Sequence, residues 1–165
     1  MSLETLDTNG LYILLFIRDD PPKPDEFHWA YYFHRDAKRG GTKYHVRGVG
    51  GGWITGHEDT HAVMKEFLLV GLFKIADISP KHQEKIDPIM RSFDGQLNRP
   101  EITCRVWLLW VLALLQRTDD GERIVKCDTL DDLETEIKDW GNQHAMSAAN
   151  NVQPRPVGAS LICEL

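Results

Sequence analysis

The sequence predicts an α+β protein in which an antiparallel sheet packs on a central buried helix. Three observations predict this class. Runs rich in apolar and aromatic residues at 11–18 and 27–34 are typical of strands. Residues 106–115 are all apolar, a stretch about half the length of a membrane span, which indicates a helix inside a globular fold. The chain has 165 residues, enough for one domain with a core and short for two.

The first part of the chain is predicted to be strand-rich. Strand 11–18 leads into a loop, because the prolines within 21–24 remove backbone donors. Strand 27–34 follows, and after a glycine-containing turn comes strand 42–49. We therefore expect a hairpin over 27–49.

Alternation along strand 27–34 separates its side chains into two groups. Phe27 and Trp29 belong to one face of the strand, and His28 belongs to the other. His45 lies in the second arm of the hairpin, so two histidines fall in paired strands. Trp29 and Trp53 are candidates to line a pocket.

The middle of the chain changes from glycine-rich to apolar. After the glycines at 50–52, the segment 57–67 could turn helical before an apolar strand at 68–78. Ser79 is a suitable N-cap for a helix over 80–93, which has proline at its first position. This helix precedes the central one.

The central helix is expected over Thr103–Gln116, with Cys104 in its first turn. A thiol at a helix N-terminus has its thiolate stabilised by unpaired N–H groups and by the helix dipole. A second, amphipathic helix is expected over 129–149, where Gly141 costs about 1 kcal/mol relative to alanine. The tail at 150–165 is expected to form an edge strand or an ordered strap.

Composition limits the partners. The net charge is −6 and no dense cluster of Lys or Arg is present, which disfavours nucleic acids and anionic membranes. We expect a small-molecule or peptide-like substrate. The first ten residues lack the apolar region of a signal peptide, which predicts a cytoplasmic protein. Cys104, Cys127 and Cys163 are odd in number and far apart, so we expect reduced thiols rather than a disulfide framework.

Three segments resemble the circularly permuted papain-like thiol enzymes, the group of lecithin retinol acyltransferase, its phospholipid-acyltransferase relatives and NlpC-type peptidases. They are FHWAYYFH with His28, TKYHV with His45 and TCRVWLL with Cys104. The resemblance implies a catalytic set of Cys104 as nucleophile, His28 as general base and His45 as the group that orients His28. It covers residues 11–116 within a single domain over 1–165, and the helix and tail at 117–165 have no counterpart in it.

The chemistry implied by this resemblance is acyl transfer through a thioester, either hydrolysis or transfer to an amine or alcohol, with no cofactor. The sequence departs from the family at Thr103, where members commonly have asparagine, and at Arg105, where they have an acidic or small residue. The FHW, GGTKYH and TCRVW segments also resemble those of small fungal proteins.

Two alternatives remain open on the sequence. The segment His57–His61 reads HEDTH, which matches the zinc hydrolase pattern of two helical histidines and a glutamate base, here Glu58. Asp59 stands where zinc proteases have a bulky apolar residue, and His82 and Glu84 are candidates for a third ligand. The other alternative is a non-catalytic binding module of the same fold.

Overall fold

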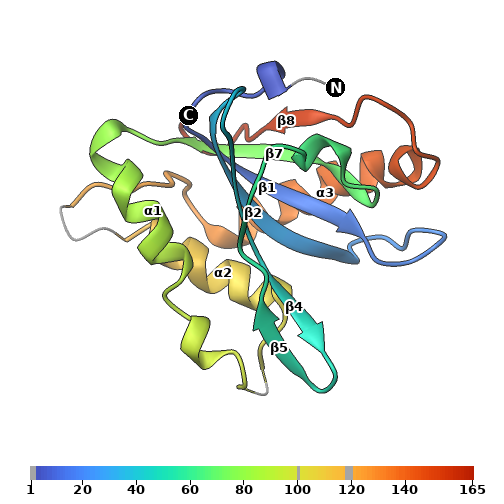
Figure 1. Ribbon diagram of the computed structural model, residues 1–165, viewed down its shortest axis with the longest axis horizontal. Coiled ribbons are helices and arrows are strands. Elements are labelled where there is room, and N and C mark those ends of the chain that lie inside the picture. Colours follow the sequence, from blue (N-terminus) through green and yellow to red (C-terminus); the bar gives the residue numbers. More distant parts are fainter. Residues whose placement is uncertain (1–2, 100, 118–120) are drawn as a thin grey trace.

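A six-stranded sheet forms the middle of the fold in the computed structural model, which describes residues 3–99, 101–117 and 121–165 (Figure 1). Its strand order is β6-β3-β2-β1-β7-β8. The strands are β1 (Gly10–Ile17), β2 (Phe27–Asp36), β3 (Gly40–Tyr44), β6 (Glu58–Thr60), β7 (Leu69–Asp77) and β8 (Val157–Ala159). Neighbours are antiparallel except β7 and β8, which are parallel. The α+β class is confirmed, with a mixed sheet in place of the expected antiparallel one.

Two helices, α2 (Cys104–Leu115) and α3 (Leu130–Ala149), cover the same face of this sheet. Each begins at a threonine cap, because the side-chain oxygens of Thr103 and Thr129 accept hydrogen bonds from backbone N–H groups three residues on. Helix α2 packs on β2, and α3 packs on β7 and β1. The central helix is therefore where the sequence predicted it, but it shares the face with α3. No helix in the described part of the chain is long and apolar enough to cross a membrane.

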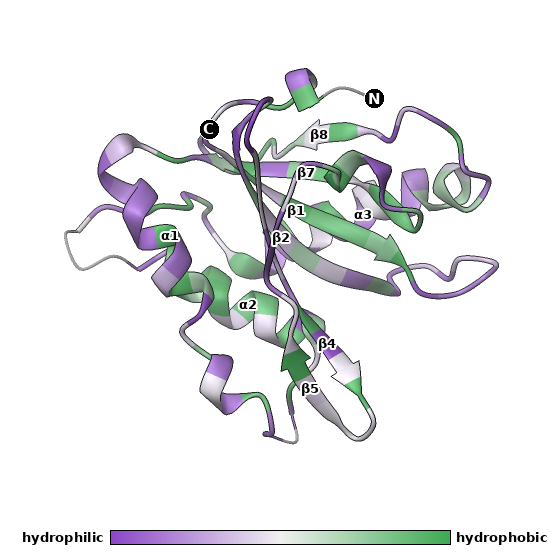
Figure 2. Cartoon of the chain, in the orientation of Figure 1, coloured by the Kyte–Doolittle hydropathy of each residue, from purple (hydrophilic) through white to green (hydrophobic). Residues whose placement is uncertain are grey.

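Strand β1 is buried on both faces, which explains its nearly continuous apolar sequence (Figure 2). Leu11, Ile13 and Leu15 join the core between the sheet and the helices. Their alternate neighbours join a second apolar cluster on the opposite face, which is covered by the short helical turn Val63–Lys65. The sheet thus separates two groups of side chains, and the placement of the histidines depends on this separation.

The predicted hairpin over 27–49 is only partly correct. β3 ends at Tyr44, and the chain then leaves the sheet at His45. The next strand, β4 (Val46–Val49), pairs instead with β5 (Gly52–Thr55) in a separate two-stranded sheet that closes through Gly50 with a φ of 61°. In the described pairing, β2 residues before Tyr31 have no partner on β3, so the start of β2 is open on that side.

The expectation of a helix at 57–67 holds only for the short turn Val63–Lys65. Residues 58–60 form β6, which pairs antiparallel with β3. Cross-strand contacts explain why the extended form is preferred, because Thr42 Oγ1 donates to Asp59 Oδ1 at 2.6 Å and Lys43 Nζ lies 3.5 Å from Glu58 Oε1.

The helix expected over 80–93 is split. A turn at Pro80–His82 precedes α1 (Gln83–Met90). Ser79 does not cap a backbone N–H group; its hydroxyl lies 3.1 Å from Nδ1 of His82.

Gly141 has a packing role in addition to its low helix propensity. A Cβ atom at this position in α3 would lie 2.6 Å from Leu15 Cδ1 and 2.9 Å from Phe27 Cζ. Because these distances are shorter than any van der Waals contact, glycine allows α3 to approach β1 and β2 closely.

The expectation of reduced thiols is wrong for two of the cysteines. Cys127 and Cys163 form a disulfide that ties the end of the chain to the segment after α2. We call residues 150–165 the C-terminal strap. Its strand β8 pairs with β7 at the edge of the sheet, so the expectation of an edge strand is confirmed. Disulfides are typical of oxidising compartments, and the cytoplasmic location stays a prediction.

Replacing Cys163 with serine is expected to lower the free energy of unfolding by about 3–4 kcal/mol. The disulfide closes a loop with a sequence separation of 36, and opening it restores chain entropy to the unfolded state. Denaturant titration of the variant and of the native protein, with and without reductant, measures the effect. Reduced native protein should match the variant, and equal stability of all the samples would contradict the prediction.

Candidate functional site

Cys104 is the first residue of α2 and lines a cavity of about 400 Å³. The cysteine is only 4% exposed, so its thiol borders this cavity from within the core. All three cysteines lie in the described residues, and Cys104 is the free one. A single thiol at the head of a buried helix is therefore available for chemistry.

Several groups that favour negative charge surround the sulfur. Burial raises the pKa of the Cys104 thiol above its ordinary value and is the largest effect. The backbone N–H of Trp29, the guanidinium of Arg18 and the backbone N–H groups of Arg105 and Cys104 act in the opposite direction. The resting group is thus a neutral thiol whose anion has donors already in place.

The walls of the cavity combine aromatic and charged side chains. Trp29 and Trp53 both line it, as the sequence suggested. The side chain of Arg105 is fixed by Glu134, whose carboxylate accepts two hydrogen bonds from the guanidinium at 2.9 and 3.0 Å. Asp25 is fixed at the rim by Asn142, which bonds both its backbone and its carboxylate.

His28 and His45 are brought together, as the resemblance implied. Nε2 of His28 lies 3.2 Å from Nδ1 of His45, and the two rings meet edge to face. Of these two facing nitrogens one donates and the other accepts, and the tautomer of each ring decides which one carries the proton.

Both histidines are uncharged at neutral pH. Burial lowers the pKa of His28 to about 4, with smaller contributions from Lys43 and Arg18. Burial likewise lowers the pKa of His45 to about 4, and the charges of Lys43, His28 and His57 lower it by smaller amounts. A neutral imidazole is the form that can accept a proton.

The structure does not join Cys104 to His28. Alternation along β2 directs Trp29 toward α2 and its core, whereas His28 lies on the other face, with its ring 5.8 Å from that of Phe16. Among the described residues, the side-chain hydrogen bond of His28 goes to His45 and none links it to the thiol. The expected nucleophile and base are therefore on adjacent parts of the fold but are not in contact in this resting state.

The zinc alternative is wrong in its geometry. Glu58 and the residues after it form β6, so His57 and His61 do not share a helix face. Both ring nitrogens of His57 are occupied, because Nδ1 accepts from the His45 N–H at 3.1 Å and Nε2 lies 3.0 Å from Asp94 Oδ1. Within the described residues, no group of three or more His, Cys, Asp or Glu side chains is arranged to hold a metal ion.

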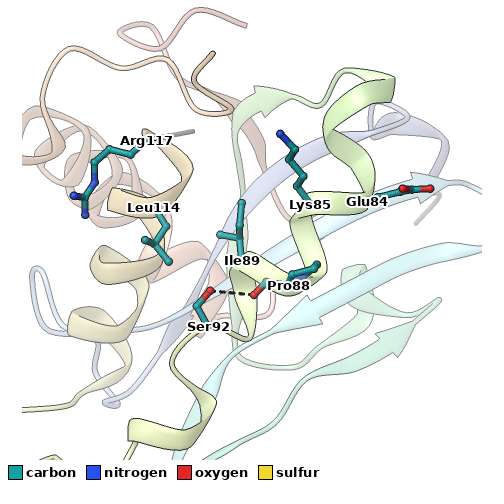
Figure 3. A pocket seen from close by; sticks show the side chains of 7 residues that line it. All are labelled: Glu84, Lys85, Pro88, Ile89, Ser92, Leu114 and Arg117. Carbon is teal, nitrogen blue, oxygen red and sulfur yellow. Dashed lines mark hydrogen bonds between the residues drawn. The ribbon is translucent and has the colours of Figure 1, made fainter. Parts of the chain in front are cut away.

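A second cavity, of about 530 Å³, lies between α1 and the end of α2 (Figure 3). Glu84, a candidate third zinc ligand, lines this cavity, while His82 is buried in the turn before α1. Ser92 Oγ donates to the carbonyl of Pro88 at 3.0 Å, which explains why this hydroxyl is not free. Cys104 does not line this second cavity, so the thiol marks the smaller cavity as the better candidate site.

Sequence reasoning missed the charged residues around the site. Arg18 directly follows Ile17, the last residue of β1, which pairs with Phe27 at the start of β2. The register of an antiparallel β1–β2 pair would therefore have placed Arg18 beside the start of β2. Lys43 is two residues before His45, but β3 ends at Tyr44, so strand alternation alone does not place their side chains on one face. Asp25, with a φ of 64°, depends on loop geometry that no sequence pattern signalled.

Comparisons with known proteins give a family but no activity. A family model described as "Family of unknown function (DUF6914)" matches residues 9–149. No curated protein and no solved structure matches the chain.

Proposed function

The chain belongs to the DUF6914 family, and we propose that it is a thiol enzyme of acyl or amide chemistry with Cys104 as its nucleophile. One observation carries the proposal: the chain's free thiol heads a buried helix, lines a cavity and is surrounded by backbone N–H donors. Helix α2 packed across antiparallel strands also fits the permuted papain-like arrangement that the resemblance implies. The cavity of about 400 Å³ suits a small-molecule or peptide-like substrate.

The reaction proceeds in two steps. In the first, the Cys104 thiolate attacks a carbonyl carbon, the proton of the thiol passes to His28, and the leaving group departs with a proton as a thioester forms on sulfur. In the second, water, an amine or an alcohol attacks the thioester and returns the thiol. Backbone N–H groups at the start of α2 are suited to stabilise the negative charge on the carbonyl oxygen.

The proton acceptor has to approach the thiol for this reaction. His28 lies at the start of β2, where β3 has already ended at Tyr44 and the strand is open. The next residue, Trp29, contacts the Cys104 sulfur through its backbone. Because His28 lies on the face of the sheet opposite the thiol and its ring is bonded to His45, the proposal includes a rearrangement of the backbone at the start of β2 when substrate binds.

Alkylation by iodoacetamide is expected at Cys104 alone, with a rate that rises through pH 9 and shows no plateau at acidic pH. Only the thiolate reacts, and burial holds the pKa of this thiol above its ordinary value. Peptide mass spectrometry of the folded protein locates the label, and Cys127 and Cys163, joined in the disulfide, act as internal controls.

A plateau of fast labelling below pH 7 would show a thiolate already paired with a charged histidine, which contradicts the neutral resting site. Labelling that is absent from Cys104 at every pH would show that the thiol is inaccessible from the cavity, and would refute the proposed nucleophile.

A further inference from the structure

One cation of the cavity beside Cys104 has no ion-pair partner in the described part of the chain. Arg18 and Arg105 both line this cavity. The guanidinium of Arg105 is bound by the carboxylate of Glu134 through two hydrogen bonds. Among the described residues, by contrast, no carboxylate forms an ion pair with Arg18. The positive charge of Arg18 is therefore available to a ligand of the cavity.

The backbone at Arg18 is fixed by the end of the sheet. It directly follows Ile17, which pairs with Phe27 in the β1–β2 register and whose N–H donates to the carbonyl of Leu68 at 2.9 Å. The side chain of Arg18 is exposed, at the border between the cavity beside Cys104 and a neighbouring cavity of about 220 Å³. A fixed backbone and an accessible side chain are what a residue that binds substrate requires.

The acidic residues nearby limit the charge of the ligand. Asp25 and Glu26 also line the cavity beside the thiol. Asp19 and Asp20 line the neighbouring cavity. These groups repel a doubly charged phosphate more strongly than a singly charged carboxylate. Because a guanidinium also matches a carboxylate with two parallel N–H donors, a carboxylate is the group that fits this position.

We propose that Arg18 determines the substrate class of this site: it binds a carboxylate of the acyl donor while Cys104 attacks the carbonyl group of the same molecule. The substrates are then small esters, thioesters or amides that carry a carboxylate and fit a cavity of about 400 Å³. The attack by the sulfur rests on the proposed function above. The preference for a negative charge does not, because alkylating reagents that form no acyl intermediate measure it.

The test compares iodoacetate with iodoacetamide as reagents for Cys104 in the full-length protein. In both reactions the thiolate forms a bond to the CH₂ carbon and iodide leaves, so the reagents differ only in a carboxylate against a neutral amide. The ratio of their rate constants cancels any change in the thiolate fraction. We expect a ratio about five times that of the same protein unfolded in urea, the gain of one exposed ion pair, and a decrease as salt is added.

Three variants separate Arg18 from the other charges. Arg18→Met should lower the ratio about fivefold, to that of the unfolded protein, whereas Arg18→Lys keeps the charge and should retain most of the preference. Glu26→Gln removes a negative charge from the same cavity and should raise the ratio. Lys23→Met is the matched control, because Lys23 is an exposed cation of the same loop that lines a different cavity. Its ratio should equal that of the native protein.

Equal ratios for the native and the unfolded protein, an unchanged ratio in Arg18→Met, or an equal fall in Lys23→Met would overturn the proposal. Failure of the proposed function gives a different result, namely a ratio that depends on Arg18 in a protein whose Cys104 accepts no acetyl group from p-nitrophenyl acetate. Labelling of Cys104 by neither reagent would refute both.

Discussion

Replacing Cys104 with alanine is expected to lower the rate of acyl transfer from p-nitrophenyl acetate by about a thousandfold or more. Without the sulfur no thioester forms, and the remaining donors of the site have no covalent intermediate to stabilise. The free energy of unfolding should fall by only about 1 kcal/mol, because one small buried group is lost. Release of p-nitrophenol and a denaturant titration measure the two effects.

Ser92→Ala serves as the control, because Ser92 lines the second cavity and not the one beside Cys104. Its acyl transfer rate should equal that of the native protein. Equal rates for Cys104→Ala and the native protein would show that Cys104 is not the nucleophile, and would favour the alternative of a non-catalytic binding module.

Replacing Arg155 with methionine is expected to lower the free energy of unfolding by about 3–5 kcal/mol. This arginine is only 2% exposed and anchors the C-terminal strap. Its guanidinium donates to the carbonyls of Leu69 at 2.7 Å, Val152 at 2.6 Å and Phe67 at 3.0 Å, and to Asn151 Oδ1 at 3.1 Å. The substitution leaves the buried Leu69 carbonyl and three partly buried acceptors without their donor.

Denaturant titration of Arg155→Met, with Arg117→Met as control, measures this contribution. Arg117 is exposed and follows α2, so its replacement should change stability by less than about 0.5 kcal/mol. A loss below about 1 kcal/mol for Arg155→Met would show that water or other groups replace the guanidinium, and that the strap does not depend on it.

Local patterns predicted the regular elements well. The apolar run at 11–18 became β1, and the thiol-headed helix begins at Cys104 with Thr103 as its cap. These elements follow from short-range periodicity and capping, which one sequence contains. The part of the expectation at 57–67 that failed has the opposite cause, because β6 is extended only through its pairing with β3, a contact between distant residues.

The candidate site was predicted in part. The pairing of His28 with His45 follows from neighbouring strands, and the structure contains it. The separation of His28 from Cys104 was also contained in the alternation of strand 27–34, which puts Trp29 toward the helix and His28 away from it. The break at His45 depends on how β3, β4 and β6 meet, which periodicity alone does not determine.

The disulfide between Cys127 and Cys163 shows a further limit. Its cysteines are separated by 36 residues, and nothing near either one in the sequence indicates a partner. Their approach follows from the parallel pairing of β8 with β7, which returns the end of the chain to the segment after α2. Contacts between distant parts of the chain therefore determine that Cys127 and Cys163 form a disulfide and that Cys104 is free.

The most direct test of the account is mass spectrometry of the protein quenched during its reaction with p-nitrophenyl acetate. We predict one acetyl group per chain, bound to the peptide that contains Cys104, labile to hydroxylamine as a thioester is, and absent from Cys104→Ala. An acetyl group found only on lysine or serine, or the same modification in Cys104→Ala, would contradict the assignment of Cys104 as the nucleophile.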